Sequence, residues 1–222
     1  MEKQIWDFLL GKGCTQEGAA GLMGNLKAES GFKPTNLQNI YEKSLGYSDQ
    51  AYTDAVDNGS YENFTHDSAG YGLAQWTYCT RKQNLLAYAK TKGTSVGNLQ
   101  TQLEFLWHEL ESSFQKTMEI ILYTNSVEEA SEIVMLDFER PANTLPAAVA
   151  ARAELGLEIY EELKEEEEMR YQTVKECPDW AQPTIQRMVD NKEISGDGKG
   201  LDLSMDMIRA FVITENMMKR EG

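Results

Sequence analysis

The sequence predicts a mainly α protein: a helical N-terminal domain with a small irregular region that contains a β-hairpin, followed by a small helical C-terminal module. Three observations support this fold class. Apolar residues recur at the spacing of an amphipathic helix over most of residues 1–163, with an interruption at about residues 31–72. A strongly acidic run, EELKEEEEMR, follows. Short amphipathic segments and a glycine-rich turn complete the chain.

The first predicted helix covers residues 2–10. Its apolar residues Ile5, Trp6, Leu9 and Leu10 share one side, and Gly11 and Gly13 end it. We expect it to pack on the helix that follows.

The second predicted helix covers residues 16–30, because Thr15 is a suitable N-cap and Gly31 a suitable residue just past the C-terminus. Its apolar stripe continues by helical spacing onto Glu29, and consists of Ala19, Leu22, Met23 and Leu26. Glu29 therefore lies on the buried face or turns to solvent at the helix end. Burial would raise the pKa of Glu29 toward the range that a general acid needs at neutral pH.

Residues 31–72 are rich in Asn, Asp, Ser, Gly and Tyr and lack a sustained period, which predicts loops and short irregular strands. Long loops inside a compact domain are often functional. We expect the aromatic side chains of this region to line a cleft: Tyr41, Tyr47, Tyr52, Tyr61 and Phe64.

The segment GYGLAQWTYCTR begins at Gly70 and ends at Arg81. Its two glycines, Gly70 and Gly72, either let the backbone approach a ligand closely or form a tight hairpin.

Together, AGLMGNLKAESGF and the later GYGLAQWT with its arginine resemble the phage tail-type lysozyme family, a branch of the lysozyme-like superfamily that also holds goose-type lysozymes and lytic transglycosylases. The resemblance covers residues 1 to about 163, including FERPANTLPAAVAARAELGLEIY from Phe138. It implies that Glu29 is the catalytic acid. It also implies that the GxGLxQ segment lines the sugar cleft: Gly70, Tyr71, Gly72, Leu73 and Gln75.

The resemblance implies a peptidoglycan glycosidase, a phage or prophage endolysin that cleaves between N-acetylmuramic acid and N-acetylglucosamine. Glu29 would protonate the glycosidic oxygen, and Tyr71, Gln75 and Trp76 would bind glycan, although Trp76 can equally be a core residue. Two alternatives stay open. A lytic transglycosylase would use the same glutamate, and an inactive glycan-binding protein would serve in a tail or in wall adhesion.

Hydrolysis with inversion needs a second carboxylate, whereas a lytic transglycosylase needs none. Asp67 lies one position from a supporting aspartate of goose-type lysozymes, and Thr77 stands where they can have another. We therefore expect Asp67 to assist. Other loop aspartates are equivalent candidates: Asp49, Asp54 and Asp57.

The rest of the first domain is predicted as helices over residues 81–92, 99–110, 127–138 and 147–163, with apolar stripes that we assign to the core. Pro141 and Pro146 interrupt the helical pattern. Glu139 and Arg140 are either site residues or members of an ordinary ion pair.

We place an acidic linker or helix extension at residues 164–172 and a small helical wall-binding and oligomerisation module at residues 173–222. Its WAQPTIQ pattern distantly resembles S-layer homology repeats and the wall-binding modules of phage lysins. Trp180, Ile185 and Met188 are expected to face inward. Ile208, Phe211 and Val212 are expected to pair with another copy, since so small a core is marginal by itself.

The net charge of −15 argues against a nucleic-acid partner. No apolar run approaches the ~20 residues that cross a bilayer, and the N-terminus lacks a secretion signal. We therefore expect no membrane insertion, synthesis in the host bacterial cytoplasm without a signal peptide, and action on the cell wall after release. The expected partners are peptidoglycan and, through the C-terminal module, a secondary wall polymer.

We expect no cofactor and no metal. The three cysteines, Cys14, Cys79 and Cys177, are odd in number and widely spaced, which indicates a reduced compartment. Two histidines and no CxxC pair argue against zinc. The aspartates of GDGKGLDLSMD lack the ligand order of a calcium-binding EF-hand: Asp197, Asp202 and Asp206.

Overall fold

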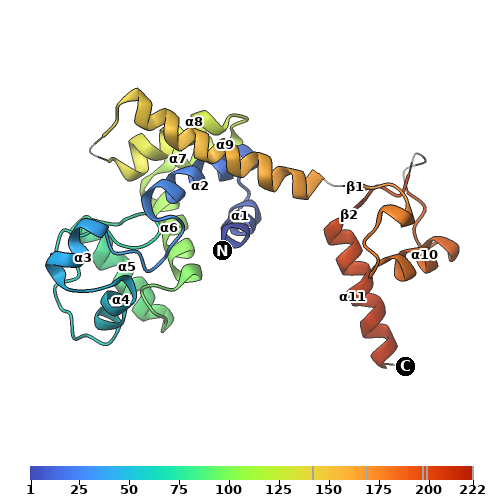
Figure 1. Ribbon diagram of the computed structural model, residues 1–222, viewed down its shortest axis with the longest axis horizontal. Coiled ribbons are helices and arrows are strands. Elements are labelled where there is room, and N and C mark those ends of the chain that lie inside the picture. Colours follow the sequence, from blue (N-terminus) through green and yellow to red (C-terminus); the bar gives the residue numbers. More distant parts are fainter. Residues whose placement is uncertain (142, 169, 197, 199, 222) are drawn as a thin grey trace. The chain divides into compact units, whose positions relative to one another are not determined.

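The computed structural model describes residues 1–141, 143–168, 170–196, 198 and 200–221. The chain divides into two compact units, Met1–Tyr160 and Glu161–Gly222. The predicted mainly α class is confirmed, because helices make up most of both units (Figure 1). Within the described residues, no helix is both long and apolar enough to cross a membrane.

Unit 1 is built from helices and one π-helical turn, η1. Their bounds are α1 Glu2–Gly11, α2 Gln16–Ser30, α3 Asn39–Leu45, α4 Asp49–Asp57, α5 Cys79–Lys92, α6 Leu99–Ser113, α7 Gln115–Tyr123, α8 Val127–Ile133, η1 Val134–Glu139 and α9 Pro146–Glu168, the last of which continues into unit 2.

The second helix, α2, has the predicted bounds and both predicted caps. The Thr15 hydroxyl accepts a hydrogen bond from the Gly18 amide at 3.0 Å, and Gly31 has a left-handed φ of 58°. This helix packs against α1, α7 and α8 and is buried along most of its length. The C-terminal end of α2, with Glu29 and Ser30, is therefore held in place by the core of unit 1.

Two helices, α3 and α4, lie where the sequence predicted only loops and short strands. The Ser48 side chain accepts from the Ala51 amide at the start of α4, and Gly46 ends α3 with a φ of 74°. Both helices are short, so their apolar pattern does not extend over enough turns to be recognised in the sequence.

The aromatic side chains of this region form a packed cluster rather than the wall of a cleft. Tyr52 contacts Tyr47, Tyr61, Phe64 and Tyr71 with ring centroids 5.3–6.0 Å apart. Tyr52 and Phe64 are buried. For Tyr47, Tyr52, Tyr61 and Phe64 the expectation that these rings line a cleft was wrong, because they pack on one another.

The segment that begins at Gly70 forms the tight hairpin that its glycines allow. Tyr71 and Trp76 exchange backbone hydrogen bonds of 2.9 and 3.2 Å, and Leu37 pairs with Tyr71 on the other side. Gly72 has a φ of 75°, and a Cβ there would lie 2.6 Å from the Gln102 side chain. Gln102 in turn accepts from the Leu73 amide at 2.9 Å, which anchors the hairpin to α6.

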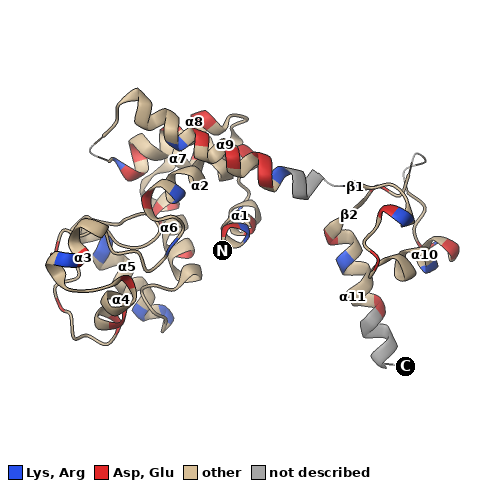
Figure 2. Cartoon of the chain, in the orientation of Figure 1, with Lys and Arg blue, Asp and Glu red and all other residues tan. Residues whose placement is uncertain are grey.

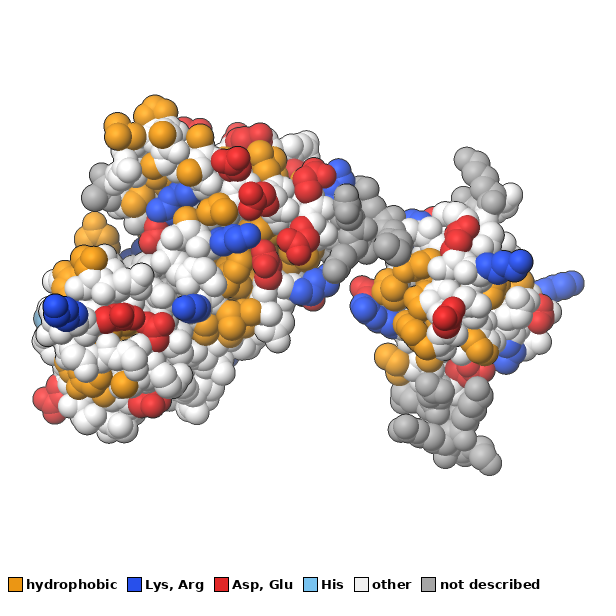
Figure 3. Space-filling model, in the orientation of Figure 1, with side chains coloured by type: hydrophobic (Ala, Val, Ile, Leu, Met, Phe, Trp, Pro, Cys, Tyr) orange, Lys and Arg blue, Asp and Glu red, His pale blue; other side chains and the backbone are white. Residues whose placement is uncertain are grey.

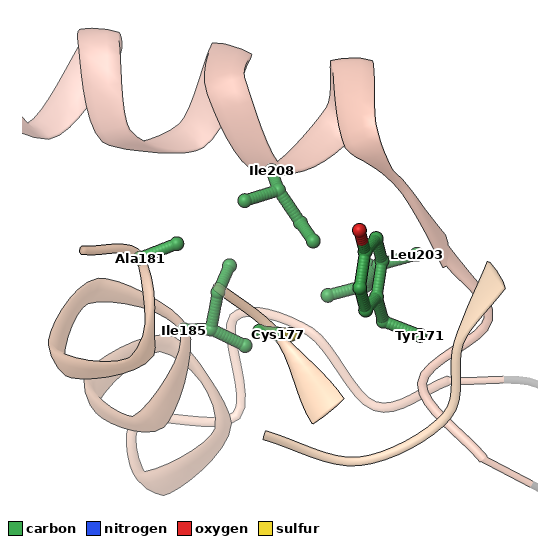
Figure 4. Packing of buried hydrophobic residues seen from close by; sticks show 6 residues of the cluster. All are labelled: Tyr171, Cys177, Ala181, Ile185, Leu203 and Ile208. Carbon is green, nitrogen blue, oxygen red and sulfur yellow. The ribbon is translucent and has the colours of Figure 1, made fainter. Parts of the chain in front are cut away.

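After the end of α9, the described residues of unit 2 form two short antiparallel strands and two longer helices around a small core. Its elements are β1 Arg170–Tyr171, a 3₁₀ turn Val174–Glu176, α10 Gln182–Asp190, β2 Leu203–Ser204 and α11 Met205–Glu221. The strands pair Arg170 with Ser204 and Tyr171 with Leu203. The core residues come from both strands, both helices and the segment between the 3₁₀ turn and α10 (Figure 4): Tyr171, Cys177, Ala181, Ile185, Leu203 and Ile208.

Two expectations about this unit need correction. Ile208 is fully buried and Phe211 and Val212 pack against the same core, so this face of α11 is used inside the unit rather than presented to another copy. Trp180, expected inside, is 52% exposed. A side chain just before α10 is free to turn outward because the helix itself begins only at Gln182.

The acidic run is part of a helix, since α9 continues through it to Glu168. Figure 2 shows acidic residues in red along α9 before its grey end. Of the aspartates in GDGKGLDLSMD, Asp202 pairs with Arg170 at 3.8 Å and Asp206 with Arg209 at 3.2 Å, and Asp197 lies outside the described residues.

Candidate active site

A cleft of about 520 Å³ opens in unit 1 where four distant segments meet. The segments are the end of α2, the loop before α3, the hairpin with the start of α5, and the end of η1. The lining residues are Glu29, Gln38, Ala74, Gln75, Thr77, Tyr78, Arg81, Glu139, Arg140 and Pro141. A volume of this size is typical of small-ligand sites.

Glu29 lies in the cleft wall, one residue before the C-terminus of α2. Its side chain is 19% exposed, and Oε1 accepts a hydrogen bond from Nη2 of Arg152 at 2.5 Å. Glu29 is thus mostly buried, which is one of the two positions that the sequence left open, and it is paired with a cation that the sequence did not reveal.

A second carboxyl group, Glu139, lies in the same cleft. It is the last residue of η1, and its side chain is only 2% exposed. Its Oε2 accepts from Nη1 of Arg152 at 2.6 Å. One guanidinium therefore contacts both carboxyl groups, Glu29 through one nitrogen and Glu139 through the other.

Burial raises the pKa of Glu139 well above its usual range, because a charged carboxylate loses hydration there. The negative charge of Glu29 and a hydrogen bond between the two carboxyl groups raise this pKa further, while Arg152 and Arg81 lower it. Oε1 of Glu139 is buried and accepts no hydrogen bond. A proton on this oxygen would turn it into a donor, so the neutral acid fits the site best.

The close approach of α2 and α9 brings Arg152 to Glu29. A Cβ on Gly24 would lie 2.5 Å from the Arg152 carbonyl oxygen and 2.6 Å from the Gly156 amide nitrogen, so only glycine fits. Asn25 adds a direct contact, accepting from Nη1 of Arg152 at 3.2 Å. Its amide nitrogen donates to the backbone and side chain of Ser131 at 3.0 and 3.1 Å. Arg152 is therefore held before any ligand arrives.

Arg81 holds the end of η1 from the other side of the cleft. Its guanidinium donates to both oxygens of Glu109 at 2.8 and 2.7 Å and to the Phe138 carbonyl at 3.2 Å. It also lies 4.5 Å from the centre of the Phe138 ring. These contacts fix the backbone next to Glu139.

Tyr71 and Trp76 are fully buried, so neither offers a face to a sugar. The Tyr71 hydroxyl pairs with Thr53 at 2.7 Å, and the Trp76 indole donates to Glu109 at 2.7 Å. The predicted glycan contacts of both residues were wrong. The aromatic side chain that does lie on the cleft is Tyr78, which is 63% exposed.

Gln75 is the one predicted sugar-binding side chain that lines the cleft. Its backbone is left-handed, with a φ of 45°. The side-chain nitrogen donates to the Asn36 carbonyl, the Asn36 side chain and the Gly72 carbonyl at 3.1, 2.9 and 3.2 Å. Gly70 is buried and donates to Gln38 at 3.0 Å. Gly70 and Gly72 therefore shape the hairpin, and Gln75 ties it to the neighbouring loop.

Asp67 does not lie in the cleft wall. Its carboxylate is fully buried and pairs with Lys82, also fully buried, at 2.6 Å. The hydroxyls of Tyr52 and Tyr61 donate to it at 2.5 and 3.0 Å. The carboxylate and burial together raise the pKa of Tyr61 to about 12, and burial lowers the pKa of Lys82.

The alternative aspartates are also engaged elsewhere, on α4. Asp49 accepts from the Leu37 amide at 2.9 Å and Asp57 from the Val96 amide at 2.8 Å, while Asp54 accepts from Gln50 at 2.8 Å. Among the described residues, the carboxyl group that shares the cleft with Glu29 is Glu139.

Sequence reasoning missed Arg152 and gave Glu139 no decided role. A signal for Arg152 was present: it falls on the buried face of its helix, one turn before Gly156, just as Glu29 falls on the buried face of α2. A charged residue at such a position needs a partner of opposite charge. The identity of that partner cannot be read from spacing.

Residues 1–163 match the family described as phage tail lysozyme. A curated relative, Morphogenesis protein 1 of Bacillus phage B103, is 28% identical over 146 residues. The aligned part is 63% of this chain and 33% of the relative, so the chain spans about a third of the length of that protein. The family resemblance of residues 1–163 is thereby confirmed, and that of the C-terminal module stays a prediction.

Proposed function

Because the chain belongs to the phage tail lysozyme family, we propose that it is a phage or prophage glycosidase acting on peptidoglycan, with Glu29 as general acid. The bond cleaved would be that between N-acetylmuramic acid and N-acetylglucosamine. The observation that carries the proposal is the position of Glu29: mostly buried, in the wall of a cleft, and held by Arg152 at 2.5 Å. A fixed acid beside an open cleft is what protonation of a leaving oxygen requires.

The rest of the cleft wall suits a glycan. Tyr78 offers an exposed aromatic face to the apolar side of a sugar ring, and Gln38, Thr77 and Arg140 offer polar groups to hydroxyl and acetamido substituents. Peptidoglycan is accordingly the proposed partner of unit 1, and unit 2 would bind a secondary wall polymer.

Lytic transglycosylation is the second candidate reaction, and one observation favours it. An inverting hydrolase holds a water between two carboxyl groups that are ~6.5–9.5 Å apart. Glu139 is buried and shares the guanidinium of Arg152 with Glu29, at 2.6 and 2.5 Å, and Asp67 is buried in an ion pair, so neither carboxyl group is free to activate that water. A transglycosylase needs no second carboxylate, because a hydroxyl of the sugar itself attacks.

The biological setting has two candidates. An endolysin would be released from the host cytoplasm to open the wall at the end of infection. The name of the phage B103 relative, a morphogenesis protein, supports instead a lysozyme carried by the virion. Both settings use the same cleft and the same chemistry.

The test of the proposed function is the Glu29→Gln variant in a turbidity assay on purified bacterial walls. Glutamine keeps the size of the side chain but removes the proton, so lysis should fall by ~10²-fold or more. The matched control is Glu132→Gln, the same change at an exposed position of α8 outside the cleft wall. Full activity in Glu29→Gln would refute the assignment, and an inactive unmodified protein would favour the glycan-binding alternative.

Mass spectrometry of the released fragments in the same assay distinguishes the two reactions. A reducing N-acetylmuramic acid end establishes hydrolysis, and an anhydromuramyl end establishes transglycosylation. Both outcomes leave Glu29 as the proton donor.

A further inference from the structure

Two carboxyl groups and a single guanidinium share the back of the cleft. Arg152 donates to Glu29 at 2.5 Å and to Glu139 at 2.6 Å, and the side chain of Arg152 is itself only 14% exposed. If both glutamates were ionised, two negative charges would face one positive charge in a place with little water. One proton on either glutamate balances the three groups.

Burial favours Glu139 as the member of the pair that carries this proton. Glu139 is the more deeply buried of the two, at 2% exposed against 19% for Glu29, so ionising it costs more hydration. Oε2 of Glu139 already accepts from Arg152, which leaves Oε1 as the protonated oxygen. Glu29 is the neighbouring acceptor.

We propose that Glu139 holds the proton that Glu29 delivers to the substrate, so that the two carboxyl groups work as one proton-sharing pair around Arg152. This inference rests on the proposed function of Glu29. Glu139 acts through Glu29 and is a positioning residue, because it keeps the proton at the site until a glycosidic oxygen is in place.

The proton balance is complete within the site and the substrate. The proton moves from Oε1 of Glu139 to Glu29, and Glu29 passes it to the glycosidic oxygen as the bond from that oxygen to the anomeric carbon breaks. The bonding electron pair stays on the leaving oxygen. Water, or a hydroxyl of the sugar, then attacks the anomeric carbon. The proton that this attacking group loses returns to the pair of carboxyl groups.

Arg152 favours transfer of the proton between Glu139 and Glu29, because its guanidinium contacts both carboxyl groups. Before transfer the negative charge lies on Glu29, next to Nη2, and after transfer it lies on Glu139, next to Nη1. The ion pair is therefore kept in both states, and charge-assisted hydrogen bonds of this kind are the strong ones.

The other charged groups near Glu139 are already paired. Arg81, on α5, is bound by Glu109 on α6 at 2.7 Å. Asp137 and Arg140, which flank Glu139 in the chain, pair with each other at 3.3 Å. The charged groups that act on the Glu139 carboxyl group are therefore Glu29 and Arg152, which are close to it, and Arg81, which is further away.

The test compares the pH profiles of wall lysis for the unmodified protein and Glu139→Gln. In the unmodified protein the pair keeps its proton up to the raised pKa of Glu139, so kcat should stay high through neutral pH and fall above that value. In Glu139→Gln the falling limb should move to lower pH by about one unit or more. The loss of kcat should be about 10-fold at pH 7 and much smaller at pH 5, with KM unchanged.

Two variants serve as controls. Glu139→Asp retains a carboxyl group and should recover part of the neutral-pH activity, while Glu132→Gln should reproduce the unmodified profile. If Glu139→Gln lowers kcat by the same factor at every pH, the role of Glu139 is merely structural and the inference fails.

An infrared measurement, which does not depend on catalysis, tests the protonation of Glu139 independently of the proposed function. Infrared difference spectra of protein with ¹³C-labelled glutamate should show the carbonyl stretch of a protonated carboxylic acid at pH 7, lost in Glu139→Gln. An inactive protein that shows this band would refute the glycosidase while the proton on Glu139 stands. An active protein without the band would refute the inference alone.

Discussion

Trp76 and Tyr78 are two residues apart, yet Trp76 is fully buried and Tyr78 is 63% exposed on the cleft. The indole of Trp76 turns inward because it donates to Glu109, which also binds Arg81. Tyr78 lies at the turn into α5, where the hairpin has ended. At the residue scale, a hydrogen bond to a distant acidic side chain decides which aromatic ring is buried and which is exposed on the cleft.

Asp67 provides the residue-scale prediction on stability. Replacing it with asparagine leaves the Lys82 ammonium buried without its counter-charge, so the free energy of unfolding should fall by about 3–5 kcal/mol. Denaturant titration measures this loss. At a temperature where the variant is still folded, kcat should stay within about 2-fold, because Asp67 acts on the packing and not on the substrate.

The double variant Asp67→Asn/Lys82→Met is the matched control, since it removes both buried charges. It should recover much of the stability lost in the single variant. A stable Asp67→Asn protein with a collapsed kcat would contradict this account and restore Asp67 as a catalytic helper.

At the element scale, the site depends on how closely α2 and α9 approach. Gly24 and Gly156 lie at the contact, where a Cβ on Gly156 would come within 2.9 Å of the Ala20 carbonyl oxygen. Glu29 follows Gly24 by little more than one turn on α2, and Arg152 precedes Gly156 by one turn on α9. The glycine contact therefore sets the distance between the acid and its guanidinium.

Gly24→Ala tests this contact. The added Cβ would meet backbone atoms of α9 at 2.5–2.9 Å, and backbone cannot move aside as a flexible side chain can. The expected loss of unfolding free energy is about 1–3 kcal/mol. Since Arg152 shifts with α9, wall lysis should fall by about 10-fold or more.

Gly11→Ala is the control for Gly24→Ala, because a Cβ at Gly11 would meet nothing within 4 Å. Its stability and activity should equal those of the unmodified protein. Unchanged lysis in Gly24→Ala would show that the α2–α9 distance does not control the site.

At the scale of the whole molecule, the chain has two units with separate cores. The cleft and all its lining residues belong to unit 1, and the core around Ile185 and Ile208 belongs to unit 2. Figure 3 shows hydrophobic side chains on the surface of unit 2, and Trp180, Met207 and Ile213 are 52%, 40% and 59% exposed. Exposed apolar side chains on so small a unit suit it to binding.

Truncation after Leu163 should separate chemistry from wall binding. The shortened protein keeps the cleft and should cleave soluble glycan fragments within about 2-fold of the full chain, because none of the described residues of unit 2 lines the cleft. Its sedimentation with intact walls should fall by about 10-fold or more, as expected when one of two linked contacts is removed.

The full chain carrying Glu29→Gln is the control for truncation, since it should sediment with walls without cleaving them. Size-exclusion chromatography of both lengths tests for pairing between copies. If the truncated protein sediments with walls as well as the full chain does, and both are monomers, unit 2 is neither a targeting nor an oligomerisation element.

Local patterns in the sequence were enough to determine the helical class, the bounds and caps of α2 and the family of residues 1–163, and they gave the hairpin at Gly70 as one of two alternatives. Each of these depends on neighbours in the chain: a cap three residues from its amide, an apolar stripe at helical spacing, a glycine at a turn. Such features can be recognised from the sequence alone because they need no residue that is distant in the chain.

Only the tertiary structure decided which charges share the cleft. Glu29 and Arg152 are 123 residues apart, and nothing in the spacing of either helix names the other. The same holds for Asp67, whose burial follows from Lys82 and the surrounding tyrosines rather than from its own segment. A buried charge is unfavourable unless an opposite charge lies next to it. The pairing of Glu29, Arg152 and Glu139 is therefore determined by how the helices pack, and not by the local sequence.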